Sequence, residues 1–383
     1  MMRLLVLFLA TANAFILLYA PQPLLPIWKD EFQLSISAVS HTISITIITL
    51  AITSFILASK FDLYNRKKII LLASIALIIP STMIAVSDSF NTILFWRFAY
   101  GLFIPGVTAV MMAYASEEFP AKHRGKIMGI YVSANVGGGL LGRVISGPIA
   151  DLLSWKAVFG FMAIFSTIVA FLVWKYLPNP KNQTKKNNNS SLIHFKNPTL
   201  VGTFAIGFAQ FFAFISFFTY IPFYVSGAPF HLTVTEVSLL YLTYAFGLLS
   251  APISGYISDR IGRRWTMANG HIIAVIGILL TLFGTLPTII IGASLLAFGN
   301  FASQSATTAF VTDIATTSRG AATSLYLFFF YLGGSLGSWI PGIIWDEFAW
   351  NGVVFSTVGT ICIALMINAS LTKKSSSSQN ISA

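Results

Sequence analysis

The chain has 383 residues, of which 56% are hydrophobic and only 9% are charged, and its formal net charge at pH 7 is +11. Such a composition excludes a water-soluble globular domain and is typical of a protein that crosses the membrane many times. At about 20 residues for each span, with short loops, the length accommodates about twelve transmembrane helices. The single cysteine, Cys362, excludes a disulfide within the chain.

Apolar runs divide the chain into predicted membrane spans. The chain starts as a signal peptide does, with Arg3 before a short apolar core, but the apolar run continues to about Pro26, so we predict a first span instead of a cleaved leader. The predicted spans cover residues 4–27, 36–58, 68–87, 91–114, 125–150, 155–177, 199–225, 234–257, 265–285, 287–311, 320–343 and 350–371. Residues 178–198, rich in Pro, Asn and Lys, form a predicted linker between six-helix bundles at 1–177 and 199–372, and residues 373–383 form a polar tail.

The loops carry their charges unevenly. One set of loops and span ends holds two basic residues, Lys29 and Lys156, against seven acidic ones, whereas the other set, with both termini, holds nineteen basic and five acidic residues. Cytoplasmic loops are enriched in Lys and Arg, so we predict that both termini, the linker and the tail are cytoplasmic in a cell membrane. The positive charge indicates anionic lipid headgroups, rather than nucleic acid, as the partner.

The two halves of the sequence repeat each other. At a constant spacing of 195 residues, Arg124 matches Arg319, Tyr131 matches Tyr326, Gly138 matches Gly333, Gly142 matches Gly337 and Trp155 matches Trp350. Because each half holds an even number of spans, the repeats are parallel. The pattern predicts an all-α fold of two six-helix bundles related by a pseudo-two-fold axis along the membrane normal, which is the architecture of transporters whose halves rock.

A charged hairpin at residues 255–264 reads GYISDRIGRR and lies between two apolar runs. It resembles the Gly-x-x-x-Asp-Arg-x-Gly-Arg-Arg/Lys loop of the major facilitator superfamily, a family of membrane transporters, and a weaker copy at residues 58–68 reads ASKFDLYNRKK. Arg97, four residues before a glycine, is similar to an intramembrane element of that family. Residues 138–148 resemble the glycine-rich fifth span of its proton-driven efflux members, except that Arg143 stands where glycine is usual.

The two hairpins are predicted to gate one side of the molecule electrostatically. Asp259 can face the amino-terminal end of a neighbouring helix, and Arg263 or Arg260 can pair with an acid at another span end. The predicted gating residues are Asp62, Arg66 and Glu118 in the first half and Asp259, Arg260, Arg263 and Asp313 in the second. The alternative is that the hairpins only set the topology through their positive charge.

Arg97 and Arg143 are the charged residues predicted inside the spans. A mid-span arginine costs about 2.5 to 3.5 kcal/mol and is usually kept for function, although snorkelling to the headgroups is an alternative. No Asp or Glu lies deep in a predicted span, but the second span contains His41, and histidine is the residue type that most often carries protons near neutral pH. Arg97, Arg143 and His41 are therefore the predicted proton-coupling residues, with a hydrogen-bonded packing role as the alternative for His41.

Spans one, four, seven and ten line the central cavity in the family that the sequence resembles. Side chains of those spans give the predicted substrate contacts, which are Asn13, Tyr19, Gln22, Arg97, Gln210, Phe214, Phe217, Tyr224, Asn300 and Gln304. An unbroken helix cannot present both Asn13 and Gln22, but Pro21 makes a kink plausible, so the choice between them stays open. Each polar residue could instead bond between helices. Amides among aromatic rings favour an amphipathic or lipophilic substrate.

These features predict a secondary active transporter, not an enzyme, that works by alternating access as a monomer. We expect it to use a proton gradient, without a cofactor or metal, to export drug-like or lipophilic small molecules or metabolites. The alternatives are a proton-coupled uptake symporter for a small organic solute, with Arg97 or Arg143 binding an anionic group, and a non-transporting sensor or scramblase. The chain has no Gly-x-x-x-x-Gly-Lys-Ser loop, which disfavours pumping by ATP.

Overall fold

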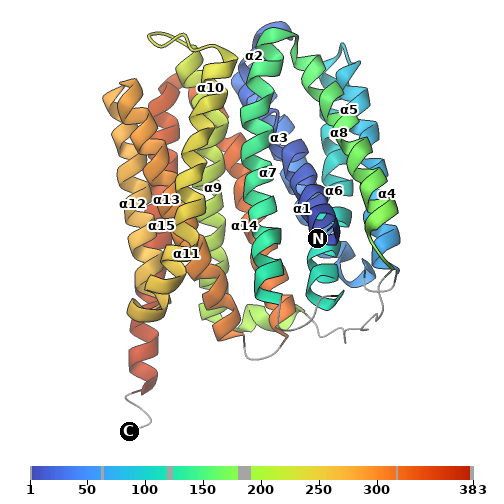
Figure 1. Cartoon of the computed structure of the whole chain (residues 1–383). Helices are drawn as coiled ribbons and strands as arrows, with labels where there is room; N and C mark the ends of the chain where they lie inside the picture. The colour runs from blue at the N-terminus through green and yellow to red at the C-terminus, as the bar shows by residue number, and fades with distance from the viewer. Residues whose placement is uncertain (1, 62–63, 119–123, 180–190, 316–317, 380–383) are drawn as a thin grey trace. The chain divides into compact units, whose positions relative to one another are not determined.

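The computed structural model describes residues 2–61, 64–118, 124–179, 191–315 and 318–379, which are nearly all helical and include no β-strand (Figure 1). Helices bond their backbone polar groups within one segment, as a bilayer requires. Within these ranges, ten helical segments are long and apolar enough to cross a membrane by length and composition. The two glycine-rich helices α7 (Arg124–Leu152) and α14 (Arg319–Ile343) complete the predicted twelve.

The remaining elements follow the predicted order. Before and after α7 in the first half lie α1 (Met2–Tyr19), η1 (Gln22–Leu24), α2 (Leu25–Glu31), α3 (Ile36–Phe61), α4 (Arg66–Ala76), α5 (Ile78–Ala85), α6 (Phe90–Glu118) and α8 (Trp155–Tyr176). Around α14 in the second half lie η3 (Ser191–Lys196), α9 (Pro198–Ser226), α10 (Val234–Leu240), η4 (Tyr241–Thr243), α11 (Tyr244–Ile261), α12 (Arg263–Leu280), η5 (Thr281–Phe283), α13 (Leu286–Ile314) and α15 (Trp345–Gln379).

Several predicted spans are interrupted. The first breaks after Tyr19, where Pro21 removes a backbone N–H, and the third breaks at Leu77, three residues before Pro80. The eighth span contains the short 3₁₀ turn η4 between α10 and α11. In α15, Ala349 has a φ of 46° and is not helical, so the long part of this helix begins where the sequence predicts the last span.

The described chain forms two compact units. One comprises residues 1–188 and 225–242, and the other comprises residues 189–224 and 243–383. In the first, α4, α5, α6 and α8 lie side by side (Figure 1), and α10 packs on α7. In the second, α13 contacts α11, α12 and α14. The predicted boundaries of the two six-helix bundles at the linker stay a prediction.

The sequence repeat returns as a repeat of contacts inside each unit. A Cβ atom added at Gly142 of α7 would stand 2.6 Å from the carbonyl oxygen of Ile16 in α1. Gly337 of α14 meets the carbonyl oxygen of Phe212 in α9 in the same way. Small residues allow helix backbones to approach this closely within a membrane. Glycine at these positions therefore sets the distance between the paired helices.

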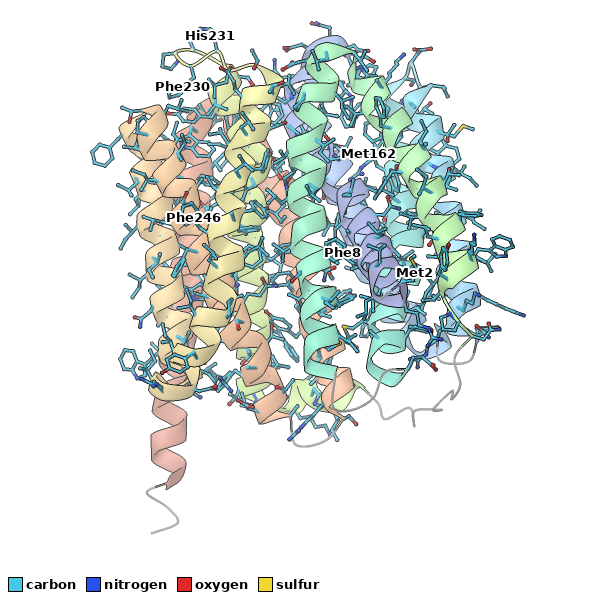
Figure 2. The ribbon with its side chains drawn as sticks, viewed as in Figure 1. Met2, Phe8, Met162, Phe230, His231 and Phe246 are labelled. Atoms are coloured by element: carbon cyan, nitrogen blue, oxygen red, sulfur yellow. The ribbon has the colours of Figure 1, made fainter. Side chains whose placement is uncertain are left out.

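Large apolar side chains project from the outer faces of the helices. Phe246 of α11, labelled in Figure 2, is 50% exposed, and Ile164 of α8 is 60% exposed. Exposed apolar surface on this scale is unfavourable in water and suits contact with lipid tails. The described helices thus present the surface that a membrane protein needs.

Candidate functional site

Arg97 of α6 lies in the interior of the first unit, and its side chain is 0% exposed. Its Nη1 donates to the carbonyl oxygen of Leu17 at 2.7 Å, and its Nη2 donates to that of Leu18 at 2.7 Å. Its Nε donates to the carbonyl oxygen of Thr42 in α3 at 3.0 Å. The guanidinium group therefore ties α6 to the end of α1 and to α3.

The break in α1 explains why carbonyl groups are available to Arg97. The amide of Ala20 still donates to Ile16 at 2.9 Å, as in a continuing helix. The next helical donor, to the carbonyl of Leu17, would be the amide of residue 21, but Pro21 has no N–H. The last carbonyl groups of a helix need partners from elsewhere. Arg97 supplies them, and its predicted roles in substrate binding and proton coupling stay predictions.

Arg143 of α7 is also buried, at 1% exposure, and joins the other side of the same break. Its Nε donates to Oε1 of Gln22 at 2.5 Å, and its Nη1 donates to the carbonyl of Gly139 at 2.7 Å. Its Cζ lies 4.0 Å from the ring centre of Tyr19 and 5.3 Å from that of Tyr241. Cation–π contacts of this kind stabilise a buried guanidinium. The structure thus brings together Tyr19, Gln22 and Arg143.

Two predicted residues of the first half lie away from this group. Asn13 is buried and donates through Nδ2 to Oγ of Ser166 in α8 at 3.1 Å, so the structure separates it from Gln22. His41 is partly buried, and its Nδ1 lies 3.3 Å from the carbonyl oxygen of Ala38, one turn earlier in α3. That local contact fits the packing role, and the proton-coupling role of His41 stays a prediction.

Gln210 connects the predicted substrate residues of the second unit. It is 1% exposed, and its Nε2 donates to the backbone carbonyl of Asn300 in α13 at 2.7 Å. Phe214, one turn further along α9, packs edge-on against Phe301 with ring centres 5.5 Å apart. Gln304 follows one turn after Asn300 and is partly buried. α9 and α13 therefore share a face of amides and aromatic rings.

The other two predicted aromatic residues of α9 face a different helix. The ring of Tyr224 is stacked on that of Trp350 in α15, with centres 4.8 Å apart, and Phe217 lies 5.3 Å from the same ring. Gln210 and Phe214 thus turn to α13, whereas Phe217 and Tyr224 turn to α15.

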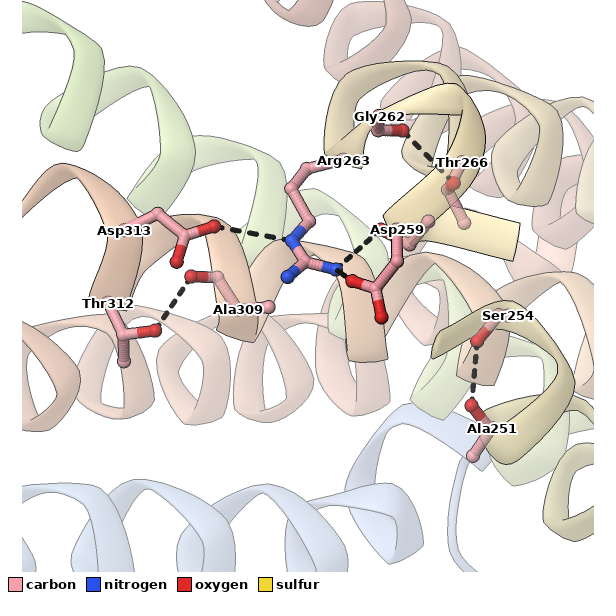
Figure 3. Close-up of polar contacts among 10 residues, drawn as sticks. Ala251, Ser254, Asp259, Gly262, Arg263, Thr266, Ala309, Thr312 and Asp313 are labelled. Atoms are coloured by element: carbon pink, nitrogen blue, oxygen red, sulfur yellow. Dashed lines mark hydrogen bonds and ion pairs between the residues drawn. The ribbon is translucent and has the colours of Figure 1, made fainter. Parts of the chain in front are cut away.

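The second-half hairpin forms an ion-pair cluster (Figure 3). Nη1 of Arg263 lies 2.7 Å from Oδ1 of Asp259, and its Nε lies 3.2 Å from Oδ2 of Asp313 at the end of α13. Gly262 turns the chain between α11 and α12 with a φ of 91°, which favours glycine. Arg260 instead lies over the ring of Tyr256, 4.3 Å from its centre. We call Asp259, Arg263 and Asp313 the hairpin cluster.

The first-half hairpin is described only in part. Asp62 lies outside the described residues, Arg66 is buried at the start of α4, and Glu118 ends α6. Asn65 replaces the glycine of the second hairpin and caps α4, because its side chain accepts from the amide of Lys68 at 3.2 Å. The predicted gating roles in both hairpins stay predictions.

The sequence did not single out a second charged contact, between α7 and α10. Oδ2 of Asp151 accepts from the backbone amide of Thr235 at 2.7 Å, in the first turn of α10. The carboxylate thus lies at a helix N-terminus, which favours negative charge. Glu236 and Thr233 form a capping box at the same turn. The acid three residues after a threonine was the available sequence signal for this helix start.

A buried histidine in α12 was also missed. His271 is 1% exposed, and its Nε2 lies 3.0 Å from Oγ of Ser303 in α13. The signal for it was a histidine within an apolar run, at residues 265–285, beside a glycine. Both helices belong to the second unit.

Comparison with known proteins places these features in a family. A family model described as the Major Facilitator Superfamily matches residues 7–229 and 227–381. The inner membrane transport protein YnfM of Escherichia coli (strain K12) is 32% identical over 376 residues, which cover 97% of this chain and 90% of that protein. The purine ribonucleoside efflux pump NepI of Shigella sonnei (strain Ss046) is 21% identical over 363 residues, covering 94% and 91%. A solved bacterial homolog of the human lysosomal transporter Spinster has a TM-score of 0.78 at 19% identity, covering 96% and 95%.

Proposed function

The chain belongs to the Major Facilitator Superfamily and is a multi-pass membrane transporter of that family, and from this premise we propose that it exports small lipophilic or drug-like molecules in exchange for protons. The exporter works by alternating access as a monomer in the cell membrane, with both termini in the cytoplasm. The asymmetry of basic residues between the two sets of loops supports that orientation.

The face shared by α9 and α13 carries the proposal about the substrate. Gln210 provides a side-chain amide that bonds to the backbone carbonyl of Asn300, and Phe214 and Phe301 provide aromatic surface on the same two helices. Binding sites for small molecules combine mostly apolar walls with a few placed polar groups. Such a face suits an amphipathic molecule with a flat apolar part and a few hydrogen-bonding groups, and it offers too few polar contacts for a sugar that lacks such an apolar part.

The relative NepI supports export as the direction, since its name describes an efflux pump for purine ribonucleosides. A purine is a flat heterocycle that stacks on aromatic rings and bonds to amides. Purine ribonucleosides are therefore sensible test substrates beside lipophilic dyes.

Arg143 favours a second candidate, a proton-coupled uptake symporter for a small anionic solute. Its guanidinium group lies between the rings of Tyr19 and Tyr241, and an arginine held this way is ready to bind a carboxylate or phosphate when a conformational change releases it. The two candidates differ in the direction of flux that a proton gradient drives.

Flux into proteoliposomes tests both candidates. The purified full-length protein is reconstituted, a pH gradient of either sign is imposed, and uptake of radiolabelled inosine, ethidium and benzoate is measured. Export by exchange predicts accumulation of inosine or ethidium in vesicles that are acidic inside. Symport predicts accumulation of benzoate from an acidic outside solution. Flux that is equal for both gradients, or no greater than in protein-free vesicles, would contradict the proton-coupled function.

A further inference from the structure

His271 lies where two helices of the second unit touch. Gly270 precedes His271 in α12, and a Cβ atom added at Gly270 would stand 2.6 Å from the carbonyl oxygen of Gly299 in α13. Gly277 lies almost two turns further along α12, and a Cβ atom added there would stand 2.5 Å from the carbonyl oxygen of Gly292. α12 and α13 are thus in backbone contact on both sides of the histidine. Its imidazole ring is enclosed between them.

The hydrogen bonds of the ring define its protonation. Nε2 of His271 lies 3.0 Å from Oγ of Ser303, a hydroxyl that can donate or accept. Nδ1 is buried and has no hydrogen-bond partner among the described residues. A charged imidazolium donates from both nitrogens, so it needs two acceptors, and here it finds one. The described conformation therefore holds the neutral ring, and protonation requires a conformation in which Nδ1 meets water or an acceptor.

Charged groups near the ring do not change this conclusion. The elements packed against α12 are α11, α13, α15 and η5. The titratable residues that they and α12 carry, within the described side chains, are Tyr244, Tyr256, Asp259, Arg260, Arg263, Arg264, Asp313, Asp346, Glu347 and Cys362. None of them forms a hydrogen bond or ion pair with His271. The described polar contact of His271 is its hydrogen bond to Ser303. No carboxylate therefore compensates a charge on the ring in this conformation.

We propose that His271, with Ser303, is the site that binds and releases the coupling proton as the second unit changes conformation. The proposal rests on the proposed proton-coupled function and names the residue that function needs. The spans that the structure describes hold no acidic side chain in their middle. Of the two histidines in these spans, His41 is partly buried and contacts the backbone of its own helix, whereas His271 is buried between two helices.

The position of Ser303 connects this site to the substrate face. Asn300, three residues earlier in α13, accepts the hydrogen bond from Gln210 through its carbonyl oxygen. A helix that moves at Ser303, when the ring takes up a proton, also moves the carbonyl of Asn300. Proton binding and the arrangement of the α9 and α13 face are thereby linked through one rigid helix, and lower pH favours the conformation other than the one described.

The conformational equilibrium of the purified full chain tests the proposal without a substrate. Cys362 is replaced by serine, spin labels are attached to cysteines placed at the exposed positions Tyr64 and Ile261, and distance distributions are recorded from pH 8 to pH 6. One linked proton changes the population ratio up to about tenfold per pH unit. We expect a change of more than about tenfold over this range for the otherwise unchanged protein. His271→Gln should reduce it to less than about twofold.

A matched control and a second variant keep the test specific. His231→Gln changes an exposed histidine in the loop before α10 and should retain the full response. Ser303→Ala keeps the imidazole ring of His271 but removes its hydrogen-bond partner. This variant should therefore shift the midpoint pH of the conformational change without altering the steepness of its pH dependence. A full response in His271→Gln, a lost response in His231→Gln, or an unmoved midpoint in Ser303→Ala would each overturn the proposal.

The flux measurement separates this proposal from the proposed function. If inosine or ethidium flux responds to the pH gradient equally in the unchanged protein and in His271→Gln, then His271 is not the proton site and proton coupling stands. If the unchanged protein gives flux that ignores the gradient, proton coupling itself is wrong, and the assignment of His271 fails with it. Loss of the response in His271→Gln alone, with exchange of labelled for unlabelled inosine retained, supports both.

Discussion

The clearest test of the role of Arg97 combines a substitution of this residue with a substitution of Pro21, the proline at the break after α1. Arg97→Met removes the guanidinium group but keeps the length and apolar character of the side chain. Pro21→Ala restores a backbone N–H at a residue whose backbone is already helical, with φ −69° and ψ −19°. That N–H would point at the carbonyl of Leu17, which now accepts from Nη1 of Arg97 at 2.7 Å. The two substitutions therefore act on the same carbonyl oxygen.

The hydrogen bonds set the expected magnitudes. Arg97→Met leaves the carbonyls of Leu17 and Leu18 buried without this donor, at about 1–3 kcal/mol each, so the free energy of unfolding should fall by about 2–6 kcal/mol. The carbonyl of Thr42 loses less, because it lies within the regular helix α3. Pro21→Ala alone should be neutral to within about 0.5 kcal/mol, since the oxygen is already bonded. In the Arg97→Met background it should recover about 1–3 kcal/mol.

Equilibrium unfolding in mixed micelles of increasing SDS content measures this coupling. The four proteins of the double-mutant cycle are compared, and the interaction energy is the difference between the effects of Pro21→Ala in the two backgrounds. Pro222→Ala, which removes the proline inside α9 of the other unit, is the matched control and should be additive with Arg97→Met. A coupling energy below about 0.5 kcal/mol for the Pro21 pair would refute the capping role of Arg97.

Three further predictions concern the hairpin cluster, the substrate face and the glycine contacts. Asp259→Asn should increase alkylation of cysteines placed on the hairpin side, with a stability loss of at most about 1 kcal/mol because the Asp259 side chain in its pair with Arg263 is 69% exposed; unchanged labelling would argue against gating. Gln210→Leu should raise the KM for the transported probe about 2- to 10-fold at unchanged expression, as expected for the loss of one hydrogen bond to the probe, and an unchanged KM would remove Gln210 from the site. Gly142→Ala should destabilise by about 1–3 kcal/mol through its clash with α1. A Cβ atom added at Gly160 meets no atom within 4 Å, so Gly160→Ala should instead stabilise the protein by up to about 1 kcal/mol. Equal unfolding midpoints for the Gly142→Ala and Gly160→Ala variants would contradict the contact between Gly142 and α1.

The sequence predicted the features that depend on periodicity and repetition. The all-α class and the twelve helical segments follow from apolar runs of membrane length, and the structure confirms them. Gly138 and Gly142 match Gly333 and Gly337 in the repeat, and each of these glycines lies against a backbone carbonyl of α1 or α9. Such features need only local pattern and spacing, which the sequence states directly.

Contacts between side chains and distant backbone could not be predicted in this way. The sequence marked Arg97 as a costly intramembrane charge, but nothing in it stated that carbonyls near Pro21, about 80 residues earlier, would be its partners. Asp151 is one of the seven acidic residues of the acidic loop set, and no sequence pattern identifies the backbone amide of Thr235 as its partner. His271 was not singled out because the apolar run around it gives no partner for the imidazole ring. The burial of its imidazole ring against α13, with one hydrogen bond to Ser303, is visible only in the structure.

The capping of α1 by Arg97 also accounts for a difference between the two halves. α6 and α13 have the same length of 29 residues, and Ala293 of α13 occupies the place that Arg97 has in α6. Gly142 meets Ile16 of α1 as Gly337 meets Phe212 of α9, so Ile16 and Phe212 are equivalent positions. Five residues later, Phe217 of α9 occupies the position that Pro21 has after α1. α9 runs unbroken from Pro198 to Ser226, so no break at that level calls for a cap. An arginine there would be a buried charge without partners, at a cost of several kcal/mol. The proline and the arginine therefore belong together, and the second half lacks both for one reason.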